Sequence, residues 1–280
     1  PLVLLSFLIA IPSYAEDVKE ADLAGNWYPA SKGELTYLLN GYLEDAKPEK
    51  ADGRIFAIIS PHAGYRFSGP VAAYGFKAVQ SQVIKTVIVI GFSHRKFFDG
   101  VSVYDRGAFK TPLGEIRVDA ELAKDIIAQN KRLFFHPDAF SGENSVEMQI
   151  PFIQLALKDA KIVPIAFGTQ SFGDAEILAS ALAKVLKDRT DCVIVASTDM
   201  SHYHPYDEAN AIDKHTVLLL NKMKAKELFD EAGLGICELC GIMPVTAALL
   251  AAEKLGFDKI KVLKYANSGD TFGDKSGVVG

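Results

Sequence analysis

The sequence predicts an α/β protein, a single domain in which a mostly parallel central sheet is flanked by helices. Three observations lead to this fold class. Apolar runs of strand length alternate with helical patterns along the chain, as in layered α/β folds. The runs are rich in β-branched residues and lack polar alternation, which is typical of strands covered on both faces. No linker rich in Pro, Gly or Ser interrupts residues 16–280, so we expect one domain there.

The strands are predicted from the apolar runs in chain order. A hairpin is expected over residues 101–118, with its turn at 111–114 (TPLG). The last third of the chain is predicted to be mostly helical before a final strand near residues 260–265. Buried strands of the central sheet are expected at residues 55–59, 86–90, 161–167 and 192–196.

Helix starts are predicted from capping residues between these strands. Ser68 is expected to cap a helix that has Pro70 in its first turn and ends near Val79. Asp119 and Asp174 each precede a run of helix formers and are the expected starts of two further helices.

The N-terminus differs from the rest of the chain. Residues 2–11 form an uncharged apolar run, followed by Pro12 and a small-x-small sequence at 13–15. This pattern is typical of a secretory signal peptide, and the run is too short to span a bilayer. We therefore predict a signal peptide at residues 1–15, a periplasmic or secreted location, and no membrane span after its removal. An ordinary buried strand or helix is the alternative.

Composition limits the classes of function. A content of 49% hydrophobic and 23% charged residues fits a soluble protein with a substantial core. The net charge of −5, without any run rich in lysine or arginine, argues against nucleic-acid binding, which needs a basic surface to displace counterions.

Histidines follow three of the predicted strands almost immediately. They are His62, His94 and His202, and Asp199 lies three residues before the last of them. In open α/β sheets, ligands bind in the crevice at the carboxyl ends of the strands. One histidine after a strand is usually structural, but three at one sheet edge predict a functional site. A further set is expected to be structural, solvated or secondary to the site: His136, His204 and His215.

Two of the three cysteines lie in the stretch "CELCGIMP" at residues 237–244. This spacing occurs in redox pairs, in zinc sites and beside single useful thiols. A second ligand pair for structural zinc is missing, and the pair does not follow an early strand as in thioredoxin-like proteins. Cys240 precedes a strongly helical run, where a helix N-terminus lowers a thiol pKa, so we favour it as a single metal ligand. A disulfide between Cys237 and Cys240 remains a hypothesis.

Several motifs resemble those of the Memo family, called protein B of the AmmeMemoRadiSam system in bacteria and archaea. They occur in family order across nearly the whole chain after residue 15. One departure is Asn144, where many relatives have histidine. The motifs are GNWYPA (25–30), SPHAGYRFSGP (60–70), GFSHR (91–95), FKTPLGEIRVD (109–119), ENSVEMQIPF (143–152), STDMSHY (197–203), LCGIMP (239–244) and SGD (268–270).

The resemblance implies a fold like that of class III extradiol dioxygenases, which are non-haem iron enzymes. It implies that His62, His94 and Cys240 are the metal ligands and that Asp199 and His202 are the remaining pocket residues. It also implies a functional link to AMMECR1-like and radical SAM proteins.

Three functions are compatible with such a site. The first is a redox enzyme that binds one transition metal ion, iron or copper before zinc, and acts on a small molecule or dioxygen. In it, His202 would be the general acid/base and Asp199 would orient it. The second is a zinc-dependent hydrolase. The third is a non-enzymatic metal-handling or peptide/protein-binding module that uses the same cleft.

Overall fold

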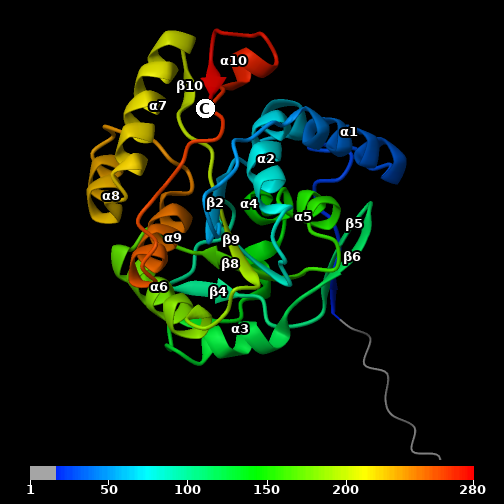
Figure 1. The fold of residues 1–280 in the computed structure, drawn as a ribbon, viewed down its shortest axis with the longest axis vertical. Helices are drawn as coiled ribbons and strands as arrows, with labels where there is room; N and C mark the ends of the chain where they lie inside the picture. Colours follow the sequence, from blue (N-terminus) through cyan, green and yellow to red (C-terminus); the bar gives the residue numbers. More distant parts are fainter. Residues whose placement is uncertain (1–16) are drawn as a thin grey trace, which may run out of the picture.

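The computed structural model of the protein describes residues 17–280 (Figure 1). The signal peptide predicted at residues 1–15 lies outside these residues. Within residues 17–280, no helix combines the length and the apolar character needed to cross a membrane.

The described residues form an α/β domain around a mostly parallel six-stranded sheet, which confirms the predicted fold class. The strand order is β2-β9-β3-β8-β4-β7, and β4 against β8 is the antiparallel neighbour pair. All four buried strands predicted from the sequence are present in this sheet. The strands are β2 (Ala57–Ser60), β3 (Thr86–Phe92), β4 (Val101–Val103), β7 (Leu133–Phe134), β8 (Lys161–Phe167) and β9 (Cys192–Ser197).

Helices cover both faces of the sheet, and two apolar cores result (Figure 1). On β3, Ile88 and Ile90 belong to the core shared with α6 and α9, whereas Val87 and Val89 belong to the core shared with α1, α2 and α5. Burial on both faces explains the unbroken apolar run. The helices are α1 (Lys32–Asp45), α2 (Tyr65–Val79), α3 (Ala120–Ile127), α4 (Asn144–Glu147), α5 (Ile150–Ala156), α6 (Phe172–Leu186), α7 (Tyr206–Asn221), α8 (Ala225–Gly233), α9 (Ile242–Lys254) and α10 (Ser268–Thr271), with a 3₁₀ turn η1 (Pro137–Phe140).

Two of the three predicted helix starts need correction. Asp119 caps α3 as predicted, by accepting a hydrogen bond from the Leu122 N–H. Helix α2 begins before Ser68, at Tyr65, because the Gly64 carbonyl closes its first turn by accepting the Ser68 N–H, and the Tyr65 N–H donates to the Trp27 carbonyl. Helix α6 is capped by Ser171.

The residues predicted to start those two helices have other partners. Ser68 donates its hydroxyl to the carbonyl of Ala63 (2.6 Å). Asp174 is buried and forms an ion pair with Arg132, which lies immediately before β7. Asp174 lies in the first turn of α6, but its carboxylate pairs with a residue that is distant in the sequence. Spacing along the sequence does not reveal such a contact.

The hairpin and the final strand also differ from the predictions. The hairpin is confined to β5 (Ala108–Thr111) and β6 (Gly114–Arg117), and β1 (Val18–Lys19) pairs with β5. Residues 260–265 form no strand; β11 (Val278–Val279) instead pairs with β10 (His202–His204). The apolar side chains of 260–265 line a cleft rather than a sheet.

Close packing at Gly91 connects β3 to α4. A Cβ at this position would lie 2.2 Å from Ser145 Oγ and 2.9 Å from a methyl carbon of Val146. We expect Gly91→Ala to reduce the free energy of unfolding by about 1–3 kcal/mol, because a packed core has no space for the added methyl group. Urea denaturation measures this change.

Gly41 provides the matched control. It lies within α1, and a Cβ there meets nothing within 4 Å. Gly41→Ala should raise the free energy of unfolding by about 0.5–1 kcal/mol, since alanine loses less backbone entropy in a helix. Equal effects of the two substitutions would contradict the packing argument.

Candidate metal centre

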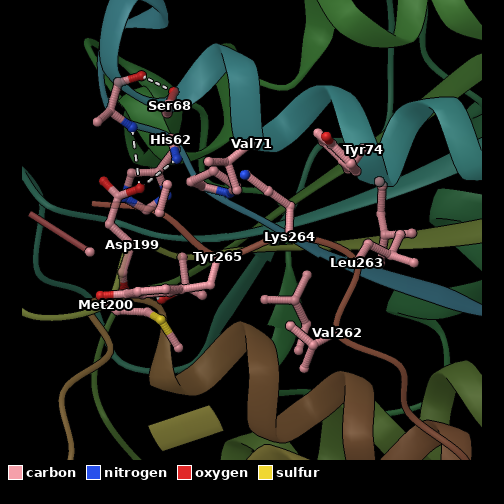
Figure 2. A pocket seen from close by; sticks show the side chains of 18 of the residues that line it. His62, Ser68, Val71, Tyr74, Asp199, Met200, Val262, Leu263, Lys264 and Tyr265 are labelled. Carbon is pink, nitrogen blue, oxygen red and sulfur yellow. Dashed lines mark hydrogen bonds and ion pairs between the residues drawn. The ribbon is translucent and has the colours of Figure 1, made fainter. Parts of the chain in front are cut away.

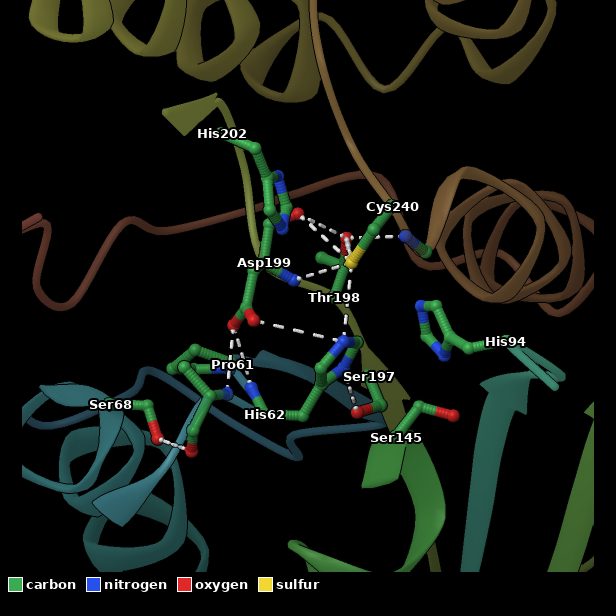
Figure 3. Close-up of polar contacts among 12 residues, drawn as sticks. Pro61, His62, Ser68, His94, Ser145, Ser197, Thr198, Asp199, His202 and Cys240 are labelled. Carbon is green, nitrogen blue, oxygen red and sulfur yellow. Dashed lines mark hydrogen bonds and ion pairs between the residues drawn. The ribbon is translucent and has the colours of Figure 1, made fainter. Parts of the chain in front are cut away.

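The predicted site residues meet at the carboxyl ends of the central strands (Figure 3). His62 follows β2, His94 follows β3, and Asp199 and His202 follow β9. Cys240 comes from the loop before α9. The parallel strands end at the same edge of the sheet, which brings loops from distant parts of the sequence together.

Two imidazoles and one thiol form the centre of this cluster. The Nε2 atom of His62 lies 3.2 Å from the Sγ atom of Cys240. One ligand atom from each of His62, His94 and Cys240 lies within 4.8 Å of the other two. Imidazole nitrogen and thiolate sulfur suit soft or borderline transition metals such as copper, iron and zinc. The donor set therefore fits the predicted kind of metal ion without selecting one element.

The two imidazoles are oriented by hydrogen bonds at their far nitrogen atoms. The Nδ1 atom of His62 lies 2.9 Å from Ser197 Oγ, and that of His94 lies 2.8 Å from Glu143 Oε1. Histidines that bind metals are typically held in this way, which fixes the ring and directs the other nitrogen to the ion. In both residues Nε2 is the nitrogen left for ligation.

Glu143 is a residue of the candidate site that the sequence reasoning missed. Its buried carboxylate also accepts hydrogen bonds from the backbone N–H groups of His94 (2.6 Å) and Ser145 (2.8 Å). It therefore fixes both the backbone and the ring of His94. The signal was present, because Glu143 opens one of the family motifs, but no spacing rule connects it to His94.

Glu143 and His94 stabilise each other's charged forms. Burial lowers the pKa of His94, but the hydrogen bond and negative charge of Glu143 outweigh burial and raise the pKa above its ordinary value. Burial raises the pKa of Glu143, but the contact with His94 outweighs it and the net shift is downward. For His62, burial is the dominant cause and lowers the pKa, which favours the neutral ring that binds metals.

Asp199 and His202 lie on another side of the thiol. Together with Cys240 they form a second group whose ligand atoms lie within 4.8 Å of one another. Asp199 Oδ1 accepts the His62 N–H at 2.7 Å, and the Asp199 N–H donates to Cys240 Sγ at 3.2 Å. Asp199 was expected to orient His202, but the His202 ring is held by the carbonyl of Met200, 2.7 Å from Nδ1.

The expected acidity of Cys240 is wrong for the metal-free site. Burial and the negative charge of Asp199 raise the pKa of the Cys240 thiol to about 12. Helix α9 begins two residues later, at Ile242, so its N-terminus does not outweigh burial. Cys237 has its thiol in the apolar core, 3.7 Å from the carbonyl oxygen of Leu228. Both thiols are free, so the structure holds no disulfide between them.

The remaining histidines lie outside both ligand groups, as expected. His204 contacts Glu238 at 2.8 Å, and His215 contacts Glu231 at 2.7 Å. Asn144, where many relatives have histidine, lines the adjoining cleft and begins α4.

A large cleft leads to the cluster (Figure 2). Its volume is about 2080 Å³, and His62, Asp199 and His202 are among the residues that line it. Side chains of α2 form one wall, and residues 262–265 lie opposite (Figure 2). The cluster is therefore accessible to ligands.

An α/β domain with an imidazole–thiol cluster at the carboxyl edge of its sheet defines the class of this protein. A family model described as Memo-like protein matches residues 19–280. The chain belongs to the Memo family, which confirms the resemblance seen in its motifs.

Curated relatives support this membership over most of the chain. A MEMO1 family protein of Pyrobaculum aerophilum is 34% identical over 271 residues, which cover 94% of this chain and 96% of the relative. A MEMO1 family protein of Sulfurisphaera tokodaii is 37% identical over 245 residues, 86% of each chain. One of Aquifex aeolicus is 35% identical over 265 residues, 94% of this chain and 96% of the relative.

The relatives also correct the predicted location. They are archaeal and bacterial proteins that align over most of their own length, and they carry no evidence of a signal peptide. The prediction of a periplasmic or secreted location rested on residues 1–15 alone and is wrong on this evidence. A short apolar run has the composition of a buried strand or helix as well as that of a signal peptide, so the pattern did not decide.

Removing the charge of Glu143 should shift the titration of His94. Glu143→Gln keeps a side-chain oxygen that can accept the N–H of His94 but loses the negative charge, so we expect the pKa of His94 to fall in metal-free protein. NMR titration of the histidine ring protons measures it. Glu238→Gln is the control, because Glu238 contacts His202 and His204 instead.

Glu143→Gln should also change how the free energy of unfolding depends on pH. The pKa of His94 is raised in the folded state, so protonation of this ring stabilises the fold. The stabilisation is complete below the ordinary histidine pKa of about 6.5, and it is lost as the pH rises through the folded-state pKa. Glu143→Gln should therefore destabilise metal-free protein more near pH 6 than in alkaline solution. A loss of stability independent of pH would contradict the charge coupling.

Proposed function

We propose that this protein is a metal-dependent redox enzyme that acts on a small molecule or on dioxygen. In this proposal His62, His94 and Cys240 bind one iron or copper ion. The observation that carries it is the meeting of a buried His62 Nε2 and the Cys240 Sγ at 3.2 Å, beside a second imidazole that Glu143 orients. Hydrogen bonds at both Nδ1 atoms direct the Nε2 atoms toward a shared ligand.

The donor atoms limit the metal to copper, iron or zinc, and the proposed redox role selects iron or copper, because zinc has no redox chemistry. Thiolate and imidazole are ligands for copper, iron and zinc, whereas magnesium and calcium prefer oxygen. When bound, iron or copper would supply electron transfer and an open position for a ligand. The protein contributes the orientation of the ligands and a cleft lined by both polar and apolar groups.

His202 is the proposed proton acceptor beside the ion. The Met200 carbonyl can only accept a hydrogen bond, so the Nδ1 atom of His202 carries the proton and Nε2 keeps a lone pair. That lone pair is available to take a proton from a bound substrate. Asp199 places its second carboxylate oxygen near the same space while its first holds the His62 loop.

A binding function is a second candidate. The cleft volume of about 2080 Å³ is larger than that of small-molecule pockets, which are about 300–1,000 Å³. This favours a peptide or protein segment as the ligand, with the metal in a non-enzymatic role. A zinc-dependent hydrolase would use the same donor atoms. AMMECR1-like and radical SAM proteins are proposed partners on family resemblance alone.

Metal content is the measurement that tests the proposal. Protein purified without oxygen and in reductant should contain about one equivalent of iron or copper. His62→Ala, His94→Ala and Cys240→Ser should each lose most of it, because two ligands hold an ion far less tightly than three. His215→Ala is the matched control and should keep the metal, since His215 contacts only Glu231 on the surface.

The alternatives are separated by the same samples. Oxygen uptake with phenolic substrates by the iron or copper form would support the redox enzyme. Zinc occupancy with ester or amide hydrolysis would replace it with the hydrolase. A protein that binds no metal under any loading condition would sink the proposal and leave the cleft as a binding surface.

A further inference from the structure

The donor atoms around Cys240 fall into two groups that share this one thiol. His62 and His94 complete the first group, and Asp199 and His202 complete the second. Among residues 17–280, no single group brings all five donor atoms within 4.8 Å of one another. Ligands of a transition metal lie about 2.0–2.3 Å from the ion, so two ligands of one ion are at most about 4.6 Å apart. The five donors do not fit around one ion as they stand.

The two groups lie on different sides of the sulfur (Figure 3). His62 and His94 project from one side, and the ring of His202 approaches from another, with the Asp199 carboxylate between His202 and His62 (Figure 3). The Cys240 sulfur lies between the groups. A thiolate keeps lone pairs after it binds one ion, so it can bind a second ion on its other side.

The second group also has ligand atoms to spare. The Nε2 atom of His202 keeps its lone pair, because Nδ1 donates to the Met200 carbonyl. Asp199 Oδ1 is used by the backbone N–H groups of His62 and Ala63. Its Oδ2 accepts no hydrogen bond from the described residues and lies 3.7 Å from His62 Nε2.

A second opening reaches two of the three donors of this group. A small pocket of about 250 Å³ is lined by His202, Cys240, Met200 and Glu238, but not by Asp199, His62 or His94. Met200 adds a thioether side chain to that lining, which soft ions favour. This pocket gives access to the second group on the side of His202 and Cys240, whereas Asp199 faces the large cleft.

We propose that this site can take up a second metal ion, bridged to the first by the Cys240 thiolate and bound by Asp199 and His202. This inference rests on the proposed function for the first ion. The carboxylate and the shared thiolate offset part of the charge of the added ion. With the second ion bound, His202 Nε2 is a ligand and no longer accepts protons, so the two-ion form should be the catalytically silent one.

Cobalt(II) is the probe for this proposal. It would be titrated without oxygen into metal-free protein, with bound cobalt measured by mass spectrometry after desalting. Absorption from thiolate-to-cobalt charge transfer reports cobalt bound at Cys240, and loss of the electron paramagnetic resonance signal by coupling reports the pair. Wild type should bind about two equivalents, and His202→Ala and Asp199→Asn about one each, with the charge-transfer band retained.

Two features keep the result interpretable. Asp199→Asn keeps an oxygen that can accept the His62 N–H, so the loop is held while the charge is lost. His204→Ala is the matched control, because His204 lies two residues from His202 in β10 but contacts Glu208 and Glu238. It should bind the same two equivalents as wild type. Circular dichroism checks that each variant is folded.

The other outcomes overturn the second site, and they differ in what they leave standing. One equivalent in wild type, unchanged in His202→Ala and Asp199→Asn, removes the second ion and leaves the first site and the proposed function intact. If wild type binds one equivalent and every variant of the five donors loses it, a rearranged cluster holds a single ion. No bound cobalt in wild type removes both the second ion and the proposed function.

Discussion

The parallel pairing of β2, β9 and β3 is the constraint on which the site depends. Ser60 lies opposite Ser197, and Ile90 lies opposite Ala196, so the three strands end at one level. Each strand is apolar on both faces and is fixed by two cores, so a shift in register would expose one of them to water. The position of every strand-end histidine is therefore set by the burial of side chains that never touch a ligand.

The cluster combines neutral buried groups with the buried carboxylate of Glu143. Neutral His62 is the most buried ring, and the thiol beside it stays protonated until a cation compensates for burial. Glu143 contacts the Nδ1 atom of His94, and its negative charge offsets positive charge on that ring. A buried carboxylate is tolerated there because three hydrogen bonds satisfy it. The protein thus provides negative charge in advance of a metal ion.

Much of the fold and part of the site followed from the sequence. The four central strands are recognisable because burial on both faces produces an unbroken apolar run. Histidines directly after such strands are expected at the carboxyl edge of the sheet. Contacts between distant segments leave no such signature. The pairing of Glu143 with His94, the pairing of Asp174 with Arg132 and the pKa of Cys240 all depend on tertiary burial. Residues 260–265 have the composition of a strand but pair with no other strand, so β-propensity alone did not predict their structure.

Asp199 ties two loops together through one residue. Its carboxylate holds the backbone after β2, while its own N–H holds the sulfur of Cys240 before α9. The conformational entropy of these segments is therefore lost during folding rather than when an ion arrives. Such preorganisation would lower the entropic cost of binding a ligand at this cluster. It also means that a substitution of Asp199 would loosen the loops of His62 and Cys240 at the same time.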